Sequence, residues 1–194
     1  MEKDRLEFLH KQYIKAIQYC NEIDENEPFS DLETAEDNFW TDVFMLAFFP
    51  ICADWKITEA ELTKFNTFVA ECGGDLHIDT KSKKWLMGLF KFHKFDLPKS
   101  LIVFCLRARV DILKTPDDDR ESSIKYNLEY LDYILCHYAD LMVSMADEIT
   151  PKVKATILKC LNICCEYISK ELSLPFPVSE NVLGFIENPN VADS

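Results

Sequence analysis

Glycine is scarce in this sequence, with only 4 residues among 194. The chain also contains no glycine-rich phosphate loop, no H-E-x-x-H pair and no G-x-S-x-G turn. Because these motifs are local, their absence disfavours a P-loop nucleotide site, a zinc protease of that type and a serine hydrolase. The longest apolar run, residues 43–53, is far shorter than the ~20 residues that a membrane-spanning helix needs. We therefore expect no transmembrane segment.

The C-x-x-C spacing of redox and zinc motifs is missing too, although the chain has eight cysteines. They are Cys20, Cys52, Cys72, Cys105, Cys136, Cys160, Cys164 and Cys165. Nearly all lie in apolar stretches with helical spacing, and the charged N-terminus does not resemble a signal peptide. We expect reduced, buried thiols in a cytoplasmic protein. A zinc site that combines His137 with neighbouring thiols is an alternative, but buried cysteines at helical spacing far more often belong to a core.

Acidic residues outnumber basic ones by 34 to 21, which gives a net charge of −13. On average such a chain repels nucleic acid and anionic membranes. It suits cations or basic partners, although a high net charge also serves solubility alone. Hydrophobic residues make up 48% of the chain, which is enough for a substantial core. We expect a protein partner, with a second copy of the chain as one candidate, and no nucleic acid.

Apolar residues recur at intervals of three and four in seven long windows, the pattern of helices with one buried face. The windows are 3–24, 36–53, 58–72, 80–95, 98–114, 116–147 and 151–172, with a short further helix near 179–187. No long window shows the alternation of a strand. We expect an all-α fold of about seven main helices in two similar halves. The single domain 1–194 would comprise an N-terminal helix and acidic linker (1–37), a core (38–172) and a tail (173–194).

Several short motifs predict where these helices begin and end. A serine followed three residues later by a glutamate forms a capping box at Ser30 and again, with threonine, at Thr58. Pro50 predicts a kink or a break near the end of the second helix. The pair of glycines at 73–74 supplies a left-handed residue that ends the third helix. Thr115 and the proline after it predict the start of the sixth helix.

Two acidic corners connect helices in the two parts of the chain. Residues 53–58 read Ala-Asp-Trp-Lys-Ile-Thr, and residues 146–150 read Ala-Asp-Glu-Ile-Thr. Each has a helix that ends in Ala-Asp, then an isoleucine, then a threonine at an N-cap position. The first corner does not fit a calcium-binding EF-hand loop, because Pro50 and Cys52 stand at ligand positions and Trp55 replaces the glycine.

The pattern Ala-Asp-x-x-Ile-x-x-x-Glu at residues 53–61 resembles the turn of the TerB-like (tellurite-resistance) helical family, in which Ala-Asp-Gly-x-Ile precedes a helix that carries a glutamate. The resemblance implies an all-helical fold with two similar halves and a divalent cation (Ca, Mn or Zn) at acidic corners. The residues carried over are Asp54, Glu61 and Asp147. The chain departs from the pattern at Trp55, which replaces the usual glycine, and at Val153, where the second corner lacks the glutamate.

The same residues also have purely structural interpretations. Glu61 would complete a capping box, and Asp54 would accept amide hydrogens within its own turn. The sequence thus leaves two main hypotheses: a non-enzymatic TerB-like module that binds a cation and is linked to stress response, or a protein-interaction or scaffold domain with structural corners. An enzyme of unrecognised type is a third, and it would require a polar pocket with perturbed acids.

Two segments have a strong local charge. Residues 22–37 contain eight acidic residues and no lysine or arginine, whereas residues 80–95 contain five lysines and no acidic residue. Either segment is a candidate docking surface, the two segments are candidates to pair with each other, and the acidic one also fits a solvated linker. Trp85 and the phenylalanines near it are expected in the core, not as base-stacking platforms.

Overall fold

The computed structural model describes residues 3–23, 32–93 and 96–187. Within these ranges the chain forms eight α-helices, two short 3-10 helices and no β-strand. The α-helices are α1 (Lys3–Ile23), α2 (Leu32–Cys52), α3 (Glu59–Glu71), α4 (Lys83–His93), α5 (Lys99–Lys114), α6 (Arg120–Met145), α7 (Pro151–Leu172) and α8 (Glu180–Glu187). The expected all-α class is confirmed. The count is eight and not about seven, because the short helix expected near 179–187 forms as α8.

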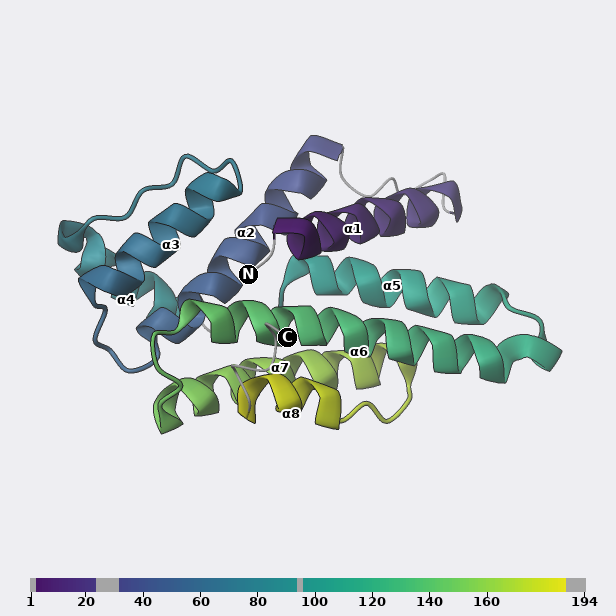
Figure 1. Ribbon diagram of the computed structural model, residues 1–194. Coiled ribbons are helices and arrows are strands. Elements are labelled where there is room, and N and C mark those ends of the chain that lie inside the picture. Colours follow the sequence, from purple (N-terminus) through teal and green to yellow (C-terminus); the bar gives the residue numbers. More distant parts are fainter. Residues whose placement is uncertain (1–2, 24–31, 94–95, 188–194) are drawn as a thin grey trace.

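The longest helix, α6, lies at the centre of the bundle (Figure 1). It runs antiparallel to α5 on one side and contacts α7 and α8 on the other, while α1 packs along α5. The α2 helix packs against α6, α5 and α7 and leads to one end of the molecule, where α3 and α4 lie. None of the described helices has the length and apolarity needed to cross a membrane. The functional candidates discussed below lie at the α3–α4 end.

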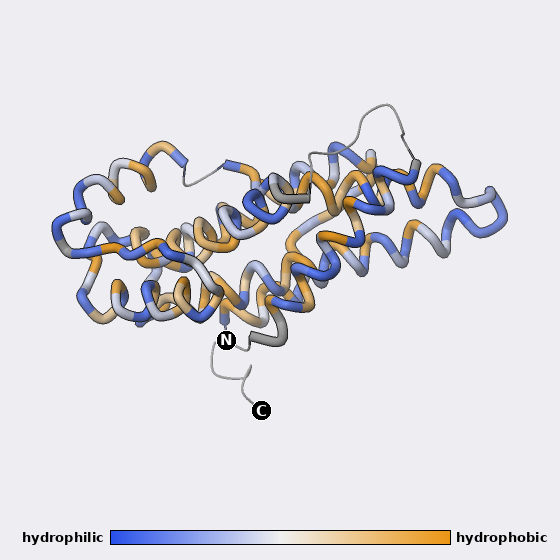
Figure 2. The backbone as a smooth tube through the Cα atoms, turned by 90° about the horizontal axis from the view of Figure 1, so that it is seen from above, coloured by the Kyte–Doolittle hydropathy of each residue, from blue (hydrophilic) through white to orange (hydrophobic). Residues whose placement is uncertain are grey.

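The core follows from the apolar stripes of these helices. Figure 2 shows hydrophobic positions turned toward the space between helices and hydrophilic ones at the surface and in turns. Phe39, Leu46 and Ile51 of α2 are almost completely buried, as expected for a helix that is apolar nearly all round. They meet Leu131 and Leu135 of α6 in one continuous core. Burying each such side chain contributes about 1.5–3 kcal/mol before the entropy of ordering is subtracted.

Several predicted helix boundaries are confirmed. Thr58 and Glu61 form both hydrogen bonds of the capping box that starts α3. Gly73 has a φ of 81°, the left-handed conformation that ends this helix. Its neighbour Gly74 is required for a different reason, because a Cβ there would lie 2.9 Å from the Val69 side chain. The α2 helix continues for two residues beyond Pro50 and then stops.

Other boundary predictions are wrong or lie outside the described ranges. Thr115 ends α5 and does not start the next helix: its amide and its hydroxyl both donate to the Asp111 carbonyl. The short 3-10 helix η2 (Asp117–Asp119) then precedes α6. The expected helix 80–95 begins as the 3-10 helix η1 (Thr80–Ser82), which Asp79 caps. The capping box predicted at Ser30 lies outside the described residues.

Candidate functional site

The first acidic corner is a tight turn between α2 and α3. Asp54 folds back on its own loop, where its Oδ1 accepts a hydrogen bond of 2.8 Å from the Lys56 amide. Trp55 has a φ of 67°, a left-handed conformation that costs a non-glycine residue about 1–2 kcal/mol. Its ring lies edge-on to Phe90 of α4, with 5.9 Å between the centroids. The backbone therefore has the conformation that favours glycine, although the residue is tryptophan.

The Thr58 hydroxyl links the two halves of the cap. It accepts from the Glu61 amide at 3.1 Å and donates to Glu61 Oε2 at 3.0 Å. The same carboxylate accepts from the Thr58 amide at 2.8 Å. These bonds satisfy donors at the N-terminus of α3, where a negative charge is also favoured by the helix dipole. Glu61 thus has a complete structural role in its own turn.

The two acidic corners meet in space. Asp147, in the loop between α6 and α7, has its Oδ2 3.5 Å from the Thr58 hydroxyl oxygen. Carboxylates from the two parts of the chain, Glu61 and Asp147, therefore face the same hydroxyl group. The second corner also starts its helix as expected, since the Thr150 hydroxyl accepts from the Val153 amide at 3.3 Å. No glutamate completes a box there.

The neighbours of this corner offset its negative charge. The Lys83 ammonium donates a 2.6 Å hydrogen bond to the Ile57 carbonyl and so brings a positive charge beside the turn.

Burial raises the pKa of the Cys52 thiol far above its ordinary value, and the charges of Glu61 and Asp54 raise it further. Cys52 is therefore a protonated core thiol. Among the residues that the structure describes, no group of three or more His, Cys, Asp or Glu side chains is arranged to hold a metal ion.

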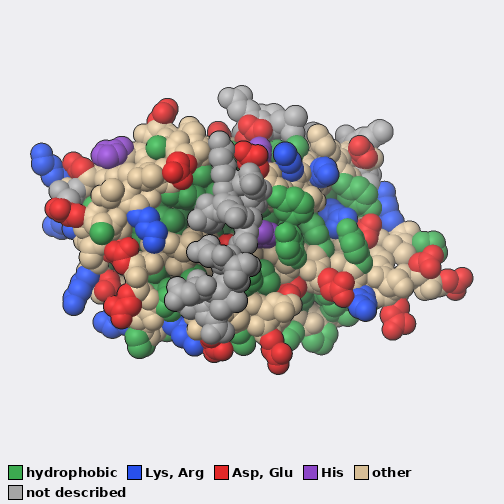
Figure 3. Space-filling model, viewed as in Figure 1, with side chains coloured by type: hydrophobic (Ala, Val, Ile, Leu, Met, Phe, Trp, Pro, Cys, Tyr) green, Lys and Arg blue, Asp and Glu red, His purple; other side chains and the backbone are tan. Residues whose placement is uncertain are grey.

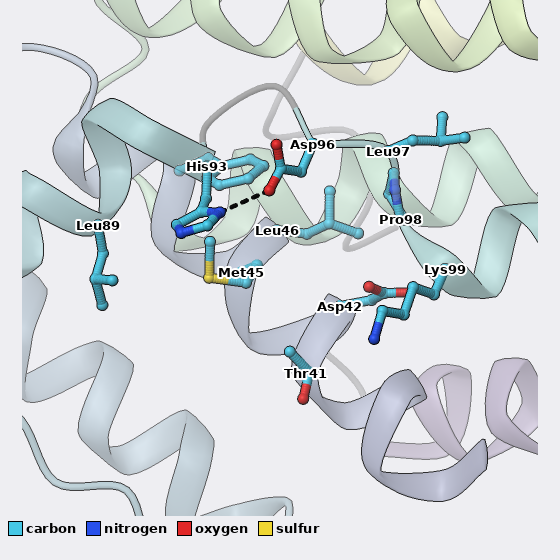
Figure 4. A pocket seen from close by; sticks show the side chains of 11 residues that line it. Thr41, Asp42, Met45, Leu46, Leu89, His93, Asp96, Leu97, Pro98 and Lys99 are labelled. Atoms are coloured by element: carbon cyan, nitrogen blue, oxygen red, sulfur yellow. Dashed lines mark hydrogen bonds and ion pairs between the residues drawn. The ribbon is translucent and has the colours of Figure 1, made fainter. Parts of the chain in front are cut away.

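A pocket opens between α2, the end of α4 and the start of α5 (Figure 4). Its volume is about 290 Å³, at the lower end of the range for small-ligand sites. Most of the lining is apolar, with Met45, Leu46, Phe49, Leu89 and Leu97. The polar groups in the lining include His93 and Asp96, which pair at 2.6 Å between Nδ1 and Oδ2. Both are exposed, so this pair lies at the rim.

Asp42 is the buried polar residue of this pocket. Its Oδ2 accepts a 2.6 Å hydrogen bond from the Ser100 amide, at the N-terminus of α5. The Ser100 hydroxyl in turn lies 2.6 Å from the Tyr138 hydroxyl of α6. Burial raises the pKa of Asp42, while hydrogen bonds from Ser100 and Lys99 and the Lys99 charge act in the opposite direction. Asp42 is absent from the residues predicted from the sequence, although it is the only charged residue between Asn38 and Ala53, and a lone carboxylate in an apolar stretch is a signal for a buried partner.

The outer surface of α4 contradicts the expectation for its aromatic residues. Leu86 and Phe90 are buried, but Trp85 is 61% exposed and Phe92 is 79% exposed. The prediction that Trp85 and the phenylalanines near it belong to the core is therefore wrong for Trp85 and Phe92 and confirmed for Phe90. Lysines accompany these rings, and Figure 3 shows lysine and arginine side chains along the left edge, the end that α3 and α4 form in Figure 1. We call Lys81, Lys84, Trp85, Lys91 and Phe92 the α4 surface.

The cysteines behave as core residues. Six of the eight are buried, and Cys72 and Cys136 are partly buried. Burial raises the pKa of Cys20 to about 11 and that of Cys165 to about 12. Cys160 and Cys164 are hydrogen-bonded to each other inside the bundle. The raised pKa values keep Cys20 and Cys165 protonated at neutral pH, and a protonated thiol is poorly suited to nucleophilic chemistry.

Comparison of the chain with known protein families, with curated proteins and with solved structures finds no match.

Proposed function

We propose that the chain is a non-enzymatic helical binding module of TerB-like type that recognises another protein and works in the cytoplasm. In this proposal the acidic corners are structural. The observation that carries it is the α4 surface, where two large aromatic rings are mostly exposed beside three lysines. Aromatic residues are enriched where proteins bind one another, and isolated proteins rarely expose them together without a partner.

The corner geometry supports the structural role. Asp54 bonds to the amide two residues ahead, and Glu61 completes a capping box. The left-handed backbone at Trp55, where the TerB-like pattern has glycine, supports the family resemblance.

A comparison of two variants tests this proposal. Asp54→Asn keeps an oxygen that can accept from the Lys56 amide, so we expect it to bind the partner with wild-type affinity. Charge reversal at Lys84 should weaken the same binding about tenfold. Affinity capture from a cell extract, followed by titration of the captured protein, measures both. If Asp54→Asn loses the partner while Lys84→Glu retains it, the corner and not α4 is the binding site.

A second candidate function is divalent cation binding at the corner. The observation that favours it is the approach of Glu61 and Asp147 to one hydroxyl, because two carboxylates close together repel each other and attract a cation. Hard cations such as Ca²⁺ and Mn²⁺ suit these oxygen ligands best. Linkage to a stress response would then operate through metal occupancy.

Thermal unfolding measures this candidate directly. If the corner binds Ca²⁺, Mn²⁺ or Zn²⁺, saturation at one hundred times Kd should stabilise the fold by about 2.7 kcal/mol. For a chain of this length that corresponds to a rise in Tm of about 5–10 °C. Asp147→Asn should abolish the rise, whereas Glu148→Gln, at the next exposed residue, should not. No change in Tm at millimolar metal rules out the cation site.

A further inference from the structure

The α4 surface is organised as parallel rows along one helix. Residues three, four or seven apart share a side of a helix. Trp85 and Phe92 are seven apart and form an aromatic row, and Lys84 and Lys91 form a lysine row next to it. On the other side of the aromatic row lie Leu89 and His93, which line the pocket described above. A ligand that crosses α4 thus meets positive charge, then aromatic rings, then an apolar cavity.

Gly88 lies between the two rows, in the middle of the helix. Glycine there costs about 1 kcal/mol relative to alanine. Apart from its chain neighbours and the nearby backbone of its own helix, a Cβ at this position would have no atom within 4 Å. Packing inside the molecule therefore gives no reason for glycine, whereas a notch between Trp85 and Phe92 lets another backbone or side chain approach closely.

Among the residues that the structure describes, no acidic side chain pairs with the lysines of this surface. Within the described ranges Lys81, Lys84 and Lys91 form no ion pair. The nearby acids are engaged elsewhere, since Asp79 caps η1 and Asp96 pairs with His93. Residues 80–95 carry five lysines and no acid in a chain whose net charge is −13. The local charge selects an acidic ligand although the whole molecule is acidic.

We propose that the α4 surface binds an acidic peptide segment of a partner protein, with an apolar side chain of that segment in the pocket lined by Met45, Phe49 and Leu89. Its carboxylates contact Lys84 and Lys91, and its backbone crosses the notch at Gly88. This inference rests on the proposed function and adds the chemistry of the partner. This binding mode is that of a peptide whose apolar side chains anchor it in a groove of its partner.

Selection from a random peptide display library against the full chain tests this inference. The enriched sequences should combine aspartate or glutamate with leucine, isoleucine or phenylalanine. Affinities of the best peptide are then measured by fluorescence anisotropy. Three variants should each weaken binding about tenfold or more: Lys84→Glu with Lys91→Glu, Trp85→Ala with Phe92→Ala, and Leu89→Trp, which fills the pocket without a change of charge.

The matched control is Lys152→Glu with Lys170→Glu, two exposed lysines of α7 that give the same change in net charge. This control should bind within about twofold of the wild type, because it leaves the local field at α4 intact. Circular dichroism verifies that every variant is folded. If the control and the α4 charge variant lose equal affinity for the peptide, net charge alone explains the loss, and the inference is overturned.

Other outcomes identify a different occupant. Binding of phosphatidylserine-containing vesicles without acidic peptides would make the surface a membrane contact, and self-association lost in the α4 variants would make it a homodimer interface. Either result overturns the acidic peptide. Peptides that bind without sensitivity to the α4 variants leave recognition of a protein partner in place but contradict the α4 surface as its site. If no peptide is enriched and affinity capture also yields no partner, both fail.

Discussion

Replacement of Asp42 by alanine should destabilise the fold by about 2–4 kcal/mol, a large share of the 5–15 kcal/mol typical of a domain. Pro98 stands at the N-cap of α5 and offers no side-chain hydrogen bond. The cap is supplied instead from α2, where Asp42 accepts the Ser100 amide at 2.6 Å. Alanine would leave buried amides without an acceptor. Urea unfolding followed by circular dichroism measures the loss, and a difference below 0.5 kcal/mol would contradict the assigned cap.

Asp42→Asn is the matched variant, because its amide oxygen can still accept from Ser100. We expect it to lose less than half of the free energy of unfolding that the alanine variant loses. The two also differ in pH dependence. Burial raises the pKa of Asp42 in the folded state, so the folded protein binds a proton on this carboxylate more tightly than the unfolded chain does. The stabilisation of the fold that comes from this proton is fully present below the unfolded pKa near 3.8 and is lost as pH rises through the raised value. The asparagine variant should lack this contribution, so its stability relative to the wild type should fall as the solution is acidified.

Replacement of Asn127 by leucine should cost a similar 2–4 kcal/mol. This side chain is completely buried between α5 and α6, where its amide nitrogen donates to Asp111 Oδ2 at 2.7 Å. Its oxygen accepts from Arg107 at 3.3 Å. The Arg107 guanidinium also lies over the Tyr130 ring, 4.6 Å from its centroid. Leucine has a similar volume but removes the bridge between two charged groups, which are then left with fewer partners in a partly desolvated site.

The control for this network is Tyr126→Phe, which keeps the exposed ring 5.7 Å from the same guanidinium. It should change stability by less than about 0.5 kcal/mol, since it deletes only an exposed hydroxyl. Chemical denaturation of both variants gives the comparison. A leucine variant as stable as the phenylalanine control would mean that water replaces the lost partners.

Much of the fold follows from local sequence signals. The capping box at Thr58, the left-handed Gly73 and the proline at the start of α7 depend on neighbours within a few residues, so the sequence alone predicts them. The meeting of Asp147 with Thr58 is a long-range contact between corners 89 residues apart. The sequence could suggest that the corners are equivalent, but their distance depends on how α6 packs against α2.

The α4 surface could not be predicted from periodicity. Leu86 and Phe90 are four residues apart and Trp85 and Phe92 are seven apart, so either pair fits one side of a helix. Which pair faces the core is decided by the approach of α2, where Phe49 contacts Phe90. Periodicity alone therefore does not separate the exposed pair from the buried pair. The lysine-rich composition of residues 80–95 was the one available signal that this helix has an outward-facing role.

The placement of tryptophan affects how unfolding of this protein is observed. Of the three tryptophans, Trp55 and Trp85 are more than half exposed and lie at the α3–α4 end, while Trp40 is partly buried in α2. Two of the three emitting rings therefore report on that end, whereas circular dichroism at helical wavelengths follows the whole bundle. Two-state unfolding gives both signals the same midpoint. A fluorescence midpoint at a lower denaturant concentration than the circular dichroism midpoint would identify α3 and α4 as a separately unfolding unit.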